Sequence, residues 1–247
     1  MKPIRPQNYG FDLIYEDNHL LIVNKPGGML VQGDATGDEP LSERAKRFLK
    51  DKYDKPGNVF CGVVHRIDRP VSGLVVLTKT SKALTRMNQV FKQRKIKKVY
   101  WAVTKRTPKE SEGKLVHWLK KNSKKNKVAV FDRAQADAQK AELRYRVMGQ
   151  LNNHTLIEVV PLTGRPHQIR AQLAALHCPI RGDVKYGFPK PNPNANIHLH
   201  ARRVHFTHPV KKEPLICTAG LPEEDFWEQF LSLDDFKVEP RKLDFMH

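Results

Sequence analysis

The chain has 247 residues and a formal net charge of +18, from 44 lysines and arginines against 26 aspartates and glutamates. At roughly 150 residues per domain, this length predicts one or two domains with a sizeable core. A hydrophobic content of 39%, taken with 14 glycines, is typical of a globular protein and excludes a disordered, collagen-like or coiled-coil chain.

The first predicted elements are a hairpin and a helix. Residues 12–25 predict two strands that meet at a turn around Asp17-Asn18 and end at Lys25-Pro26-Gly27-Gly28. Residues 39–50 predict a helix, because Leu41, Ala45, Phe48 and Leu49 fall on one side and cations on the other.

The middle of the chain predicts strands around a second helix. Residues 59–67 and 73–79 read as strands that flank a polar turn containing Pro70. Ser81 is the predicted N-cap of a helix that ends in a basic cluster, residues 92–98. Further strands are predicted at residues 99–104, 143–148 and 155–160.

The last predicted elements are a helix at residues 165–177, a loop at 186–197, a strand at 198–206 and a short helix at 223–231. Pro166 suits the first turn of the helix at 165–177, and Thr163 is its candidate N-cap. Strands interrupted by single helices predict an α+β fold around a largely antiparallel sheet. We expect one domain over residues 1–221, with residues 222–247 packed on it as a C-terminal helix and extension.

The chain carries no sign of a membrane or secreted protein. Its longest apolar stretches have the length of strands, and its N-terminus lacks an apolar segment, so we expect a cytoplasmic protein that no membrane holds. Cys61, Cys178 and Cys217 are widely separated and form no CxxC pair, which argues against a disulfide framework and a structural zinc site.

The basic excess favours a nucleic-acid partner. Residues 92–98 hold five cations in seven positions, and residues 120–127 hold five in eight. Such clusters are typical of contact with a phosphate backbone. A protein that is merely basic and soluble is the plainer interpretation, and binding to a membrane surface is less favoured because no cluster lies on a strongly amphipathic helix.

Four groups of residues could carry chemistry. On an extended backbone Arg66 and Asp68 project together, away from Ile67, and a carboxylate beside arginine stays ionised and can act as a nucleophile. Pro70 and Gly73 then predict a tight turn. An ordinary ion pair at a turn is the alternative.

The other three groups are weaker signals. Residues 163–170 could present Arg165 and the amides of a helix start to an anion, or form only a helix start with surface cations. Tyr100 could stack on a base or belong to the core. We reject a metal site at the remaining group, which consists of His198, His200, His205 and His208.

Together, and in this order, the segments resemble the RluA-type family of RNA pseudouridine synthases from about residue 15 to 210. His65-Arg66-Ile67-Asp68 matches the HRLD signature of that family, whereas the related RsuA-type enzymes usually read Gly-Arg-Leu-Asp. The other matching segments are residues 15–26, 72–74, 98–100, 163–170, 179–187 and 199–206.

The resemblance implies a role for each matching residue. Asp68 matches the catalytic aspartate, Tyr100 the tyrosine that packs on the target base and takes part in proton removal, and Arg165 the basic partner of the aspartate. Arg66 matches the arginine that fills the space of the flipped nucleotide, and Ile169 matches an apolar pocket residue. We also place His65, Lys98 and Arg170 among the residues that bind substrate.

The resemblance also implies the pseudouridine synthase fold, an α+β fold with a mixed, mainly antiparallel sheet, flanking helices and a central cleft. It implies an isomerase that converts uridine to pseudouridine in structured rRNA or tRNA and uses no metal or organic cofactor. Many relatives carry an N-terminal S4 RNA-binding module, and only a dozen residues precede the first predicted strand here, so we expect the form without it. We expect a monomer. The alternative is a non-catalytic RNA-binding or RNA-remodelling protein on the same scaffold. A third hypothesis, a metal-dependent nuclease built on the histidine group, is remote.

Overall fold

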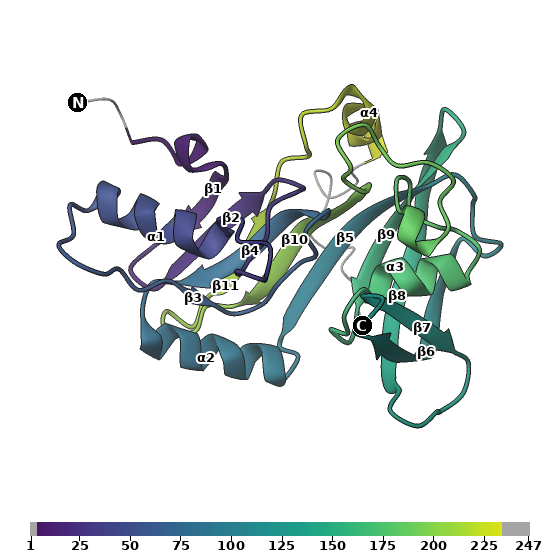
Figure 1. The fold of residues 1–247 in the computed structure, drawn as a ribbon, viewed down its shortest axis with the longest axis horizontal. Helices are drawn as coiled ribbons and strands as arrows, with labels where there is room; N and C mark the ends of the chain where they lie inside the picture. Colours follow the sequence, from purple (N-terminus) through teal and green to yellow (C-terminus); the bar gives the residue numbers. More distant parts are fainter. Residues whose placement is uncertain (1–3, 234–247) are drawn as a thin grey trace. The chain divides into compact units, whose positions relative to one another are not determined.

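The computed structural model describes residues 4–233, which form two compact units (Figure 1). The first unit contains residues 4–96 and 201–220, and the second contains residues 97–200 and 221–233. No helix within residues 4–233 is long and apolar enough to cross a membrane.

The strands of the first unit form a sheet around two central strands. Strand β1 (Asp12–Glu16) pairs antiparallel with β2 (Leu20–Lys25), and β2 pairs antiparallel with β4 (Ser72–Thr78). The two-residue strand β3 (Gly62–Val63) and the strand β10 (Leu199–Thr207) also neighbour β4, and β11 (Pro214–Thr218) pairs with β10. The apolar runs 20–23 and 74–77 are fully buried, as central strands covered on both faces require.

Two helices flank these strands (Figure 1). Helix α1 (Leu41–Lys52) begins two residues later than predicted, because Pro40 stands at its N-cap. Helix α2 (Ser81–Lys92) is capped by Thr80, whose hydroxyl accepts a hydrogen bond from the Ala83 amide at 3.1 Å. The prediction of Ser81 as the cap is therefore wrong by one residue. A short 3₁₀ turn, η1 (Pro6–Tyr9), precedes β1.

The second unit is an antiparallel sheet in the order β5-β9-β8-β6-β7. Its strands are β5 (Ile96–Thr104), β6 (Glu112–Asn122), β7 (Lys127–Phe131), β8 (Gln139–Leu151) and β9 (His154–Pro161). Helix α3 (Gln168–Ala175) and the 3₁₀ turn η2 (Val184–Tyr186) follow. Helix α4 (Asp225–Glu228) and the 3₁₀ turn η3 (Gln229–Leu233) bury Trp227 and Phe230 against Trp101, Val103 and Leu156.

The predicted α+β class and its mainly antiparallel pairing are confirmed. The strand predicted at 59–67 is wrong in extent, since only Gly62 and Val63 pair. The β6–β7 hairpin and β11 were not predicted. The domain boundary at residue 221 stays a prediction, and residues 234–247 of the predicted extension lie outside the described residues.

Candidate active site

The signature segment follows β3 in the first unit. Ile67 is buried, Arg66 is exposed and Asp68 is half-buried. This alternation agrees with the prediction that Arg66 and Asp68 project together, away from Ile67. Asp68 therefore lies at the boundary between the interior of the unit and its surface.

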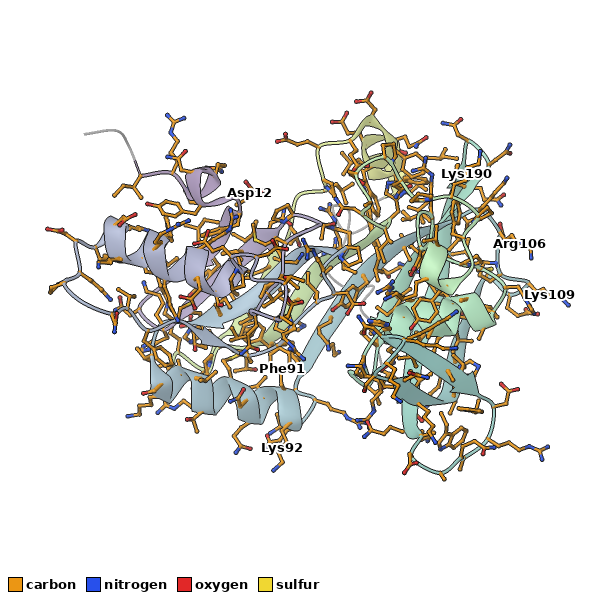
Figure 2. The ribbon with its side chains drawn as sticks, viewed as in Figure 1. Asp12, Phe91, Lys92, Arg106, Lys109 and Lys190 are labelled. Carbon is orange, nitrogen blue, oxygen red and sulfur yellow. The ribbon has the colours of Figure 1, made fainter. Side chains whose placement is uncertain are left out.

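His65 anchors this segment to the elements beside it. Its Nε2 accepts a hydrogen bond from the Val76 amide of β4 at 3.0 Å, so the proton of the neutral ring sits on Nδ1. Its ring stacks on Phe91 of α2, with centroids 4.9 Å apart and planes at 22°. Figure 2 shows Phe91 on the side of the strands and Lys92 projecting outward. Substrate binding by His65 stays a prediction.

A turn follows Asp68 directly. The Val71 amide donates to the Asp68 carbonyl at 3.0 Å, which closes the turn that contains Pro70. The Arg69 carbonyl accepts from the Gly28 amide at 2.8 Å, and the Arg69 Nε donates to the Gly28 carbonyl at 3.0 Å. The turn is thereby bound to the loop that follows β2.

Lys25, at the end of β2, completes this junction from inside. Its side chain is fully buried, and its amine donates to the carbonyls of Pro26 and Met29 at 2.8 Å each and of Arg69 at 3.3 Å. Burial lowers the pKa of Lys25 to about 7, while the negative charge of Asp68 acts in the opposite direction. Lys25 is thus a buried amine of the first unit whose pKa responds to the charge of the predicted nucleophile, and it is cationic only below about pH 7.

Gly73 has a different role from the predicted one. It lies inside β4, with a φ of +113°, and not in the turn. A Cβ at this position would stand 2.4 Å from the Ala201 carbonyl oxygen of β10. Only glycine permits this approach, which fixes β4 against β10 just after the signature turn.

In the second unit, Lys98 and Tyr100 lie two residues apart on β5 and so share a face of the sheet. Tyr100 pairs with Val159 of β9 and is 9% exposed. Burial lowers the pKa of Lys98. The Lys98 Nζ is 3.9 Å from the place of a Cβ on Gly164, so its amine lies beside the turn that carries Arg165.

A network of hydrogen bonds around the Gln168 side chain stabilises that turn. The Gln168 Oε1 accepts from the Thr163 hydroxyl at 2.7 Å and from the Arg165 amide at 3.0 Å. Its Nε2 donates to the Glu142 carbonyl of β8 at 2.9 Å, and the Glu142 amide donates to the Thr163 Oγ1 at 2.9 Å. The Arg165 Nε donates to the Lys140 carbonyl at 3.1 Å. The Arg165 side chain is thereby bound to β8 directly, and its backbone amide is bound to it through Gln168.

The helix that follows begins later than predicted. Helix α3 starts at Gln168, and His167 occupies its N-cap in the left-handed region with a φ of 51°. Thr163 therefore does not cap this helix, because its hydroxyl is engaged by Gln168 and β8. The prediction of Thr163 as the cap is wrong, and residues 165–167 form the turn instead.

Two predicted substrate-binding residues lie on α3. Ile169 is 7% exposed and Arg170 is 5% exposed. The Arg170 Nε and Nη2 donate to the two carboxylate oxygens of Asp183 at 2.7 and 2.9 Å, and its guanidinium lies 5.2 Å from the centre of the Tyr186 ring. This bidentate pair ties α3 to the segment around η2.

The predicted site residues are divided between the units. His65, Arg66 and Asp68 belong to the first, with Lys25 as a neighbour that the sequence reasoning missed. The second unit contains Lys98, Tyr100, Arg165, Ile169 and Arg170, and it brings Lys98 to the Gly164–Arg165 turn. The predicted pairing of Arg165 with Asp68 stays a prediction.

The histidine group is also divided. His198 stacks on Phe226 with centroids 4.4 Å apart, its Nε2 lies 3.1 Å from Glu224, and burial lowers its pKa to about 4. The His208 Nε2 lies 3.0 Å from an Asp17 oxygen in the first unit. Within residues 4–233, no three His, Cys, Asp or Glu side chains are arranged to hold a metal ion.

Comparison with known proteins identifies the family of the chain. The profile of the family described as RNA pseudouridylate synthase matches residues 19–175. The ribosomal large subunit pseudouridine synthase C of Buchnera aphidicola is 33% identical over 217 residues, which cover 85% of this chain and 66% of that protein. This chain thus spans about two thirds of the length of that relative.

Two further relatives match over more of their length. The tRNA pseudouridine synthase C of Vibrio cholerae is 31% identical over 240 residues, which cover 90% of this chain and 94% of that protein. The solved structure of human RNA pseudouridylate synthase domain containing 4 aligns with a TM-score of 0.74 at 25% identity, over 90% of this chain and 92% of that one. The matched residues contain every predicted site residue, and the chain belongs to the RNA pseudouridylate synthase family.

Proposed function

We propose that this chain isomerises uridines in structured rRNA or tRNA to pseudouridine, with Asp68 as the nucleophile. The observation that carries the proposal is the family match over residues 19–175, which contains Asp68, Tyr100 and Arg165. The charge of +18 supports a polyanionic substrate.

The proposed reaction exchanges one bond to the ribose C1′ for another. Asp68 attacks the target uridine as the bond between N1 of uracil and C1′ breaks. The uracil then turns, its C5 bonds to C1′, and the C5 proton leaves with the participation of Tyr100. Every heavy atom of the nucleotide is retained, the bond to Asp68 breaks again so that the carboxylate is regenerated, and the proton lost from C5 is balanced by one taken up at N1. The step therefore needs neither an oxidant nor a second substrate.

The target uridine must leave its stack before Asp68 can reach it, which costs a few kcal/mol. In our proposal Arg66, which is exposed, fills the space that the nucleotide leaves, and Tyr100 stacks on the flipped base. Ile169 lines the pocket with apolar surface. Lys98 and Arg170 belong to the same side of the proposed substrate site, Lys98 beside the Gly164–Arg165 turn and Arg170 through its pairing with Asp183.

Asp68 must stay ionised to act as a nucleophile. The Lys25 amine, whose titration responds to the charge of Asp68, supports the carboxylate from within its own unit. In our proposal Arg165 supports it from the second unit. In this proposal Arg165 supplies the positive charge when the substrate expels water, whereas the Lys25 amine is cationic only below about pH 7.

We further propose that the protein acts in the cytoplasm as a monomer, without metal or organic cofactor. In this proposal residues 1–221 work as one catalytic domain, and residues 222–233 pack on it. The relatives named for ribosomal RNA and for tRNA support both as candidate substrates.

Release of tritium from RNA labelled at C5 of uridine tests the proposal. Unmodified rRNA and tRNA transcripts are offered to wild type and to Asp68→Asn in the presence of EDTA. We expect release by wild type from at least one transcript and none by Asp68→Asn. Equal release by both proteins would contradict the assignment of Asp68.

A further inference from the structure

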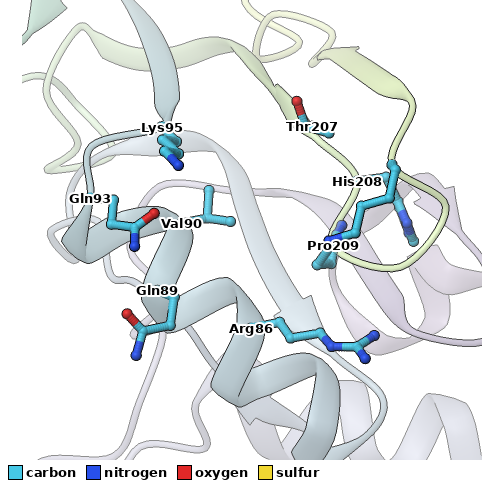
Figure 3. A pocket seen from close by; sticks show the side chains of 9 residues that line it. Arg86, Gln89, Val90, Gln93, Lys95, Thr207, His208 and Pro209 are labelled. Carbon is cyan, nitrogen blue, oxygen red and sulfur yellow. The ribbon is translucent and has the colours of Figure 1, made fainter.

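A groove of about 450 Å³ lies in the first unit, between α2 and the turn that follows β10. Figure 3 shows Arg86, Gln89, Val90 and Gln93 on its helix side, with Thr207, His208 and Pro209 across from them. None of the residues assigned to the reaction lines this groove.

The helix side of the groove is a polar stripe. Arg86, Gln89, Val90 and Gln93 follow the spacing i, i+3, i+4 and i+7, which places them on one face of α2 and of the turn that ends it. Ala83 and Met87, the buried residues of α2, adjoin this stripe on the side of Val90, so the stripe lies at the edge of the buried face of the helix. The stripe therefore presents one guanidinium and two amides to the groove.

The opposite side is a turn that His208 organises. The His208 Nδ1 accepts from the Val210 amide at 3.2 Å and from the Lys211 amide at 2.9 Å. The His208 amide donates to the Glu213 carbonyl at 2.8 Å, and the Lys212 amide donates to the His208 carbonyl at 3.0 Å. These bonds fix the backbone from which Lys212 reaches the groove.

The charge of the groove is not compensated. Arg86, Lys95 and Lys212 line it and form no ion pair within residues 4–233, and no carboxylate is among the described lining residues. The adjacent Lys211 differs, because its amine pairs with Asp17 at 3.1 Å and donates to the Tyr15 hydroxyl at 3.1 Å. The groove thus gathers three cations and two amide side chains around one volume.

We propose that this groove binds the phosphodiester backbone of the substrate RNA at a position separate from the target uridine. This inference rests on the proposed function. The cations neutralise phosphates, and Gln89 and Gln93 supply donors for phosphate or ribose oxygens. The same helix carries Phe91, which stacks on His65 of the signature segment, so α2 links the groove to the segment of Asp68.

Phosphate oxygens could also come from a free nucleotide or from inorganic phosphate. The chain favours RNA, because its three cations come from separate places: the middle of α2, the residue before β5, and the turn after β10. Cations spread in this way suit successive phosphates of a strand better than one phosphate.

The test is the affinity for a labelled transcript that wild type modifies, or for a tRNA transcript if none is modified. Each phosphate contact contributes about 0.7 to the slope of log affinity against log salt concentration. Lys95→Gln/Lys212→Gln loses two such contacts and should bind the transcript about 25-fold more weakly at 0.1 M salt. The salt slope should fall by about 1.4. Lys50→Gln/Lys55→Gln removes two exposed cations of the same unit outside the groove and should bind like wild type.

Three further measurements test whether the loss of affinity is specific to the charges of the groove. Lys95→Arg/Lys212→Arg should restore most of the affinity, and melting temperatures should show that all variants fold. Titration with uridine monophosphate and with inorganic phosphate should show no binding that depends on Lys95 and Lys212. An unchanged affinity for RNA, or equal loss in the control pair, or nucleotide binding that depends on these lysines, would overturn the proposal.

Binding is measured in the Asp68→Asn background as well as in wild type. A protein that binds RNA through the groove but releases no tritium would contradict the proposed function and leave the groove intact. If wild type releases tritium and the groove variant binds RNA as tightly as wild type, the groove proposal is overturned and the proposed function stands.

Discussion

Lys25 determines the electrostatics of the signature turn at the scale of a single residue. A fully buried amine that donates to three carbonyls holds the loop after β2 and the turn after Asp68 together. Because burial disfavours its charged form, the pKa of Lys25 falls to about 7. The amine therefore titrates near neutral pH, and the negative charge of the proposed nucleophile, Asp68, acts to raise its pKa.

This shift predicts a pH-dependent difference in stability. Between pH 7 and 10 the unfolded chain keeps a proton on Lys25 that the folded chain has released, so the free energy of unfolding rises with pH. Relative to Lys25→Met, wild type should gain at most about 1.4 kcal/mol per pH unit. Urea denaturation at pH 7, 8 and 9 measures the difference.

The exposed Lys50 is the control, since Lys50→Met should run parallel to wild type at every pH. Parallel curves for wild type and Lys25→Met would contradict the depressed pKa.

The sequence points to the residues of the signature but not to Lys25. Lysine is normally placed at the surface, because its charge is costly to bury. The available signal was its position at the end of β2, two residues after the apolar run 20–23 and directly before Pro26-Gly27-Gly28. What could not be predicted is that three carbonyls from two segments meet at its amine.

At the scale of elements, the approach of β4 to β10 depends on Gly73. In Gly73→Ala the added Cβ meets the Ala201 backbone and the residue must keep a positive φ. We expect a loss of about 3 kcal/mol or more in the free energy of unfolding, measured by urea denaturation.

Gly57 gives a matched control, because its φ is also positive, at +70°, and no atom stands within 4 Å of the place of its Cβ. Gly57→Ala should cost only about 1–2 kcal/mol. Equal costs at the two positions would mean that backbone strain alone matters and that the strand contact does not.

The turn before α3 depends on Gln168. Gln168→Met keeps the length of the side chain and removes its bonds to Thr163, Arg165 and Glu142. We expect a loss of about 2–3 kcal/mol of stability, and a fall in kcat larger than the change in KM because Arg165 loses its support. The exposed Gln135 is the control, and Gln135→Met should change neither. Unchanged kcat in a folded Gln168→Met protein would contradict a positioning role.

Apolar periodicity predicts the buried elements well and the exposed ones poorly. It predicts β2, β4, α1 and α2 because their apolar residues form the core of the first unit. It misses the β6–β7 hairpin, because the lysines of residues 120–127 resemble a solvated loop, although Lys120 and Lys121 pair with Ala129 and Val128 of β7. The hydrogen bonds from the Gln168 side chain to Thr163, Arg165 and Glu142 likewise leave no periodic signal in the sequence at the start of α3.

At the scale of the whole molecule, the chain distributes its chemistry over two units. The first holds Asp68 with Lys25 and the basic groove, and the second holds Tyr100 and Arg165. The order of the matching segments in the sequence predicts which residues form the site, and these segments belong to different units. The net charge indicates the class of substrate, because +18 over 247 residues favours binding to a polyanion.

The most direct measurement is tritium release in a single turnover, with enzyme in excess over RNA labelled at C5 of uridine. Wild type and Asp68→Asn are compared at concentrations where both bind the RNA fully, so that a difference in affinity cannot affect the result. We predict complete release at the target uridine by wild type, and a rate for Asp68→Asn at least about 1,000-fold lower, since a covalent step has lost its nucleophile. Release by Asp68→Asn at the wild-type rate would contradict the account.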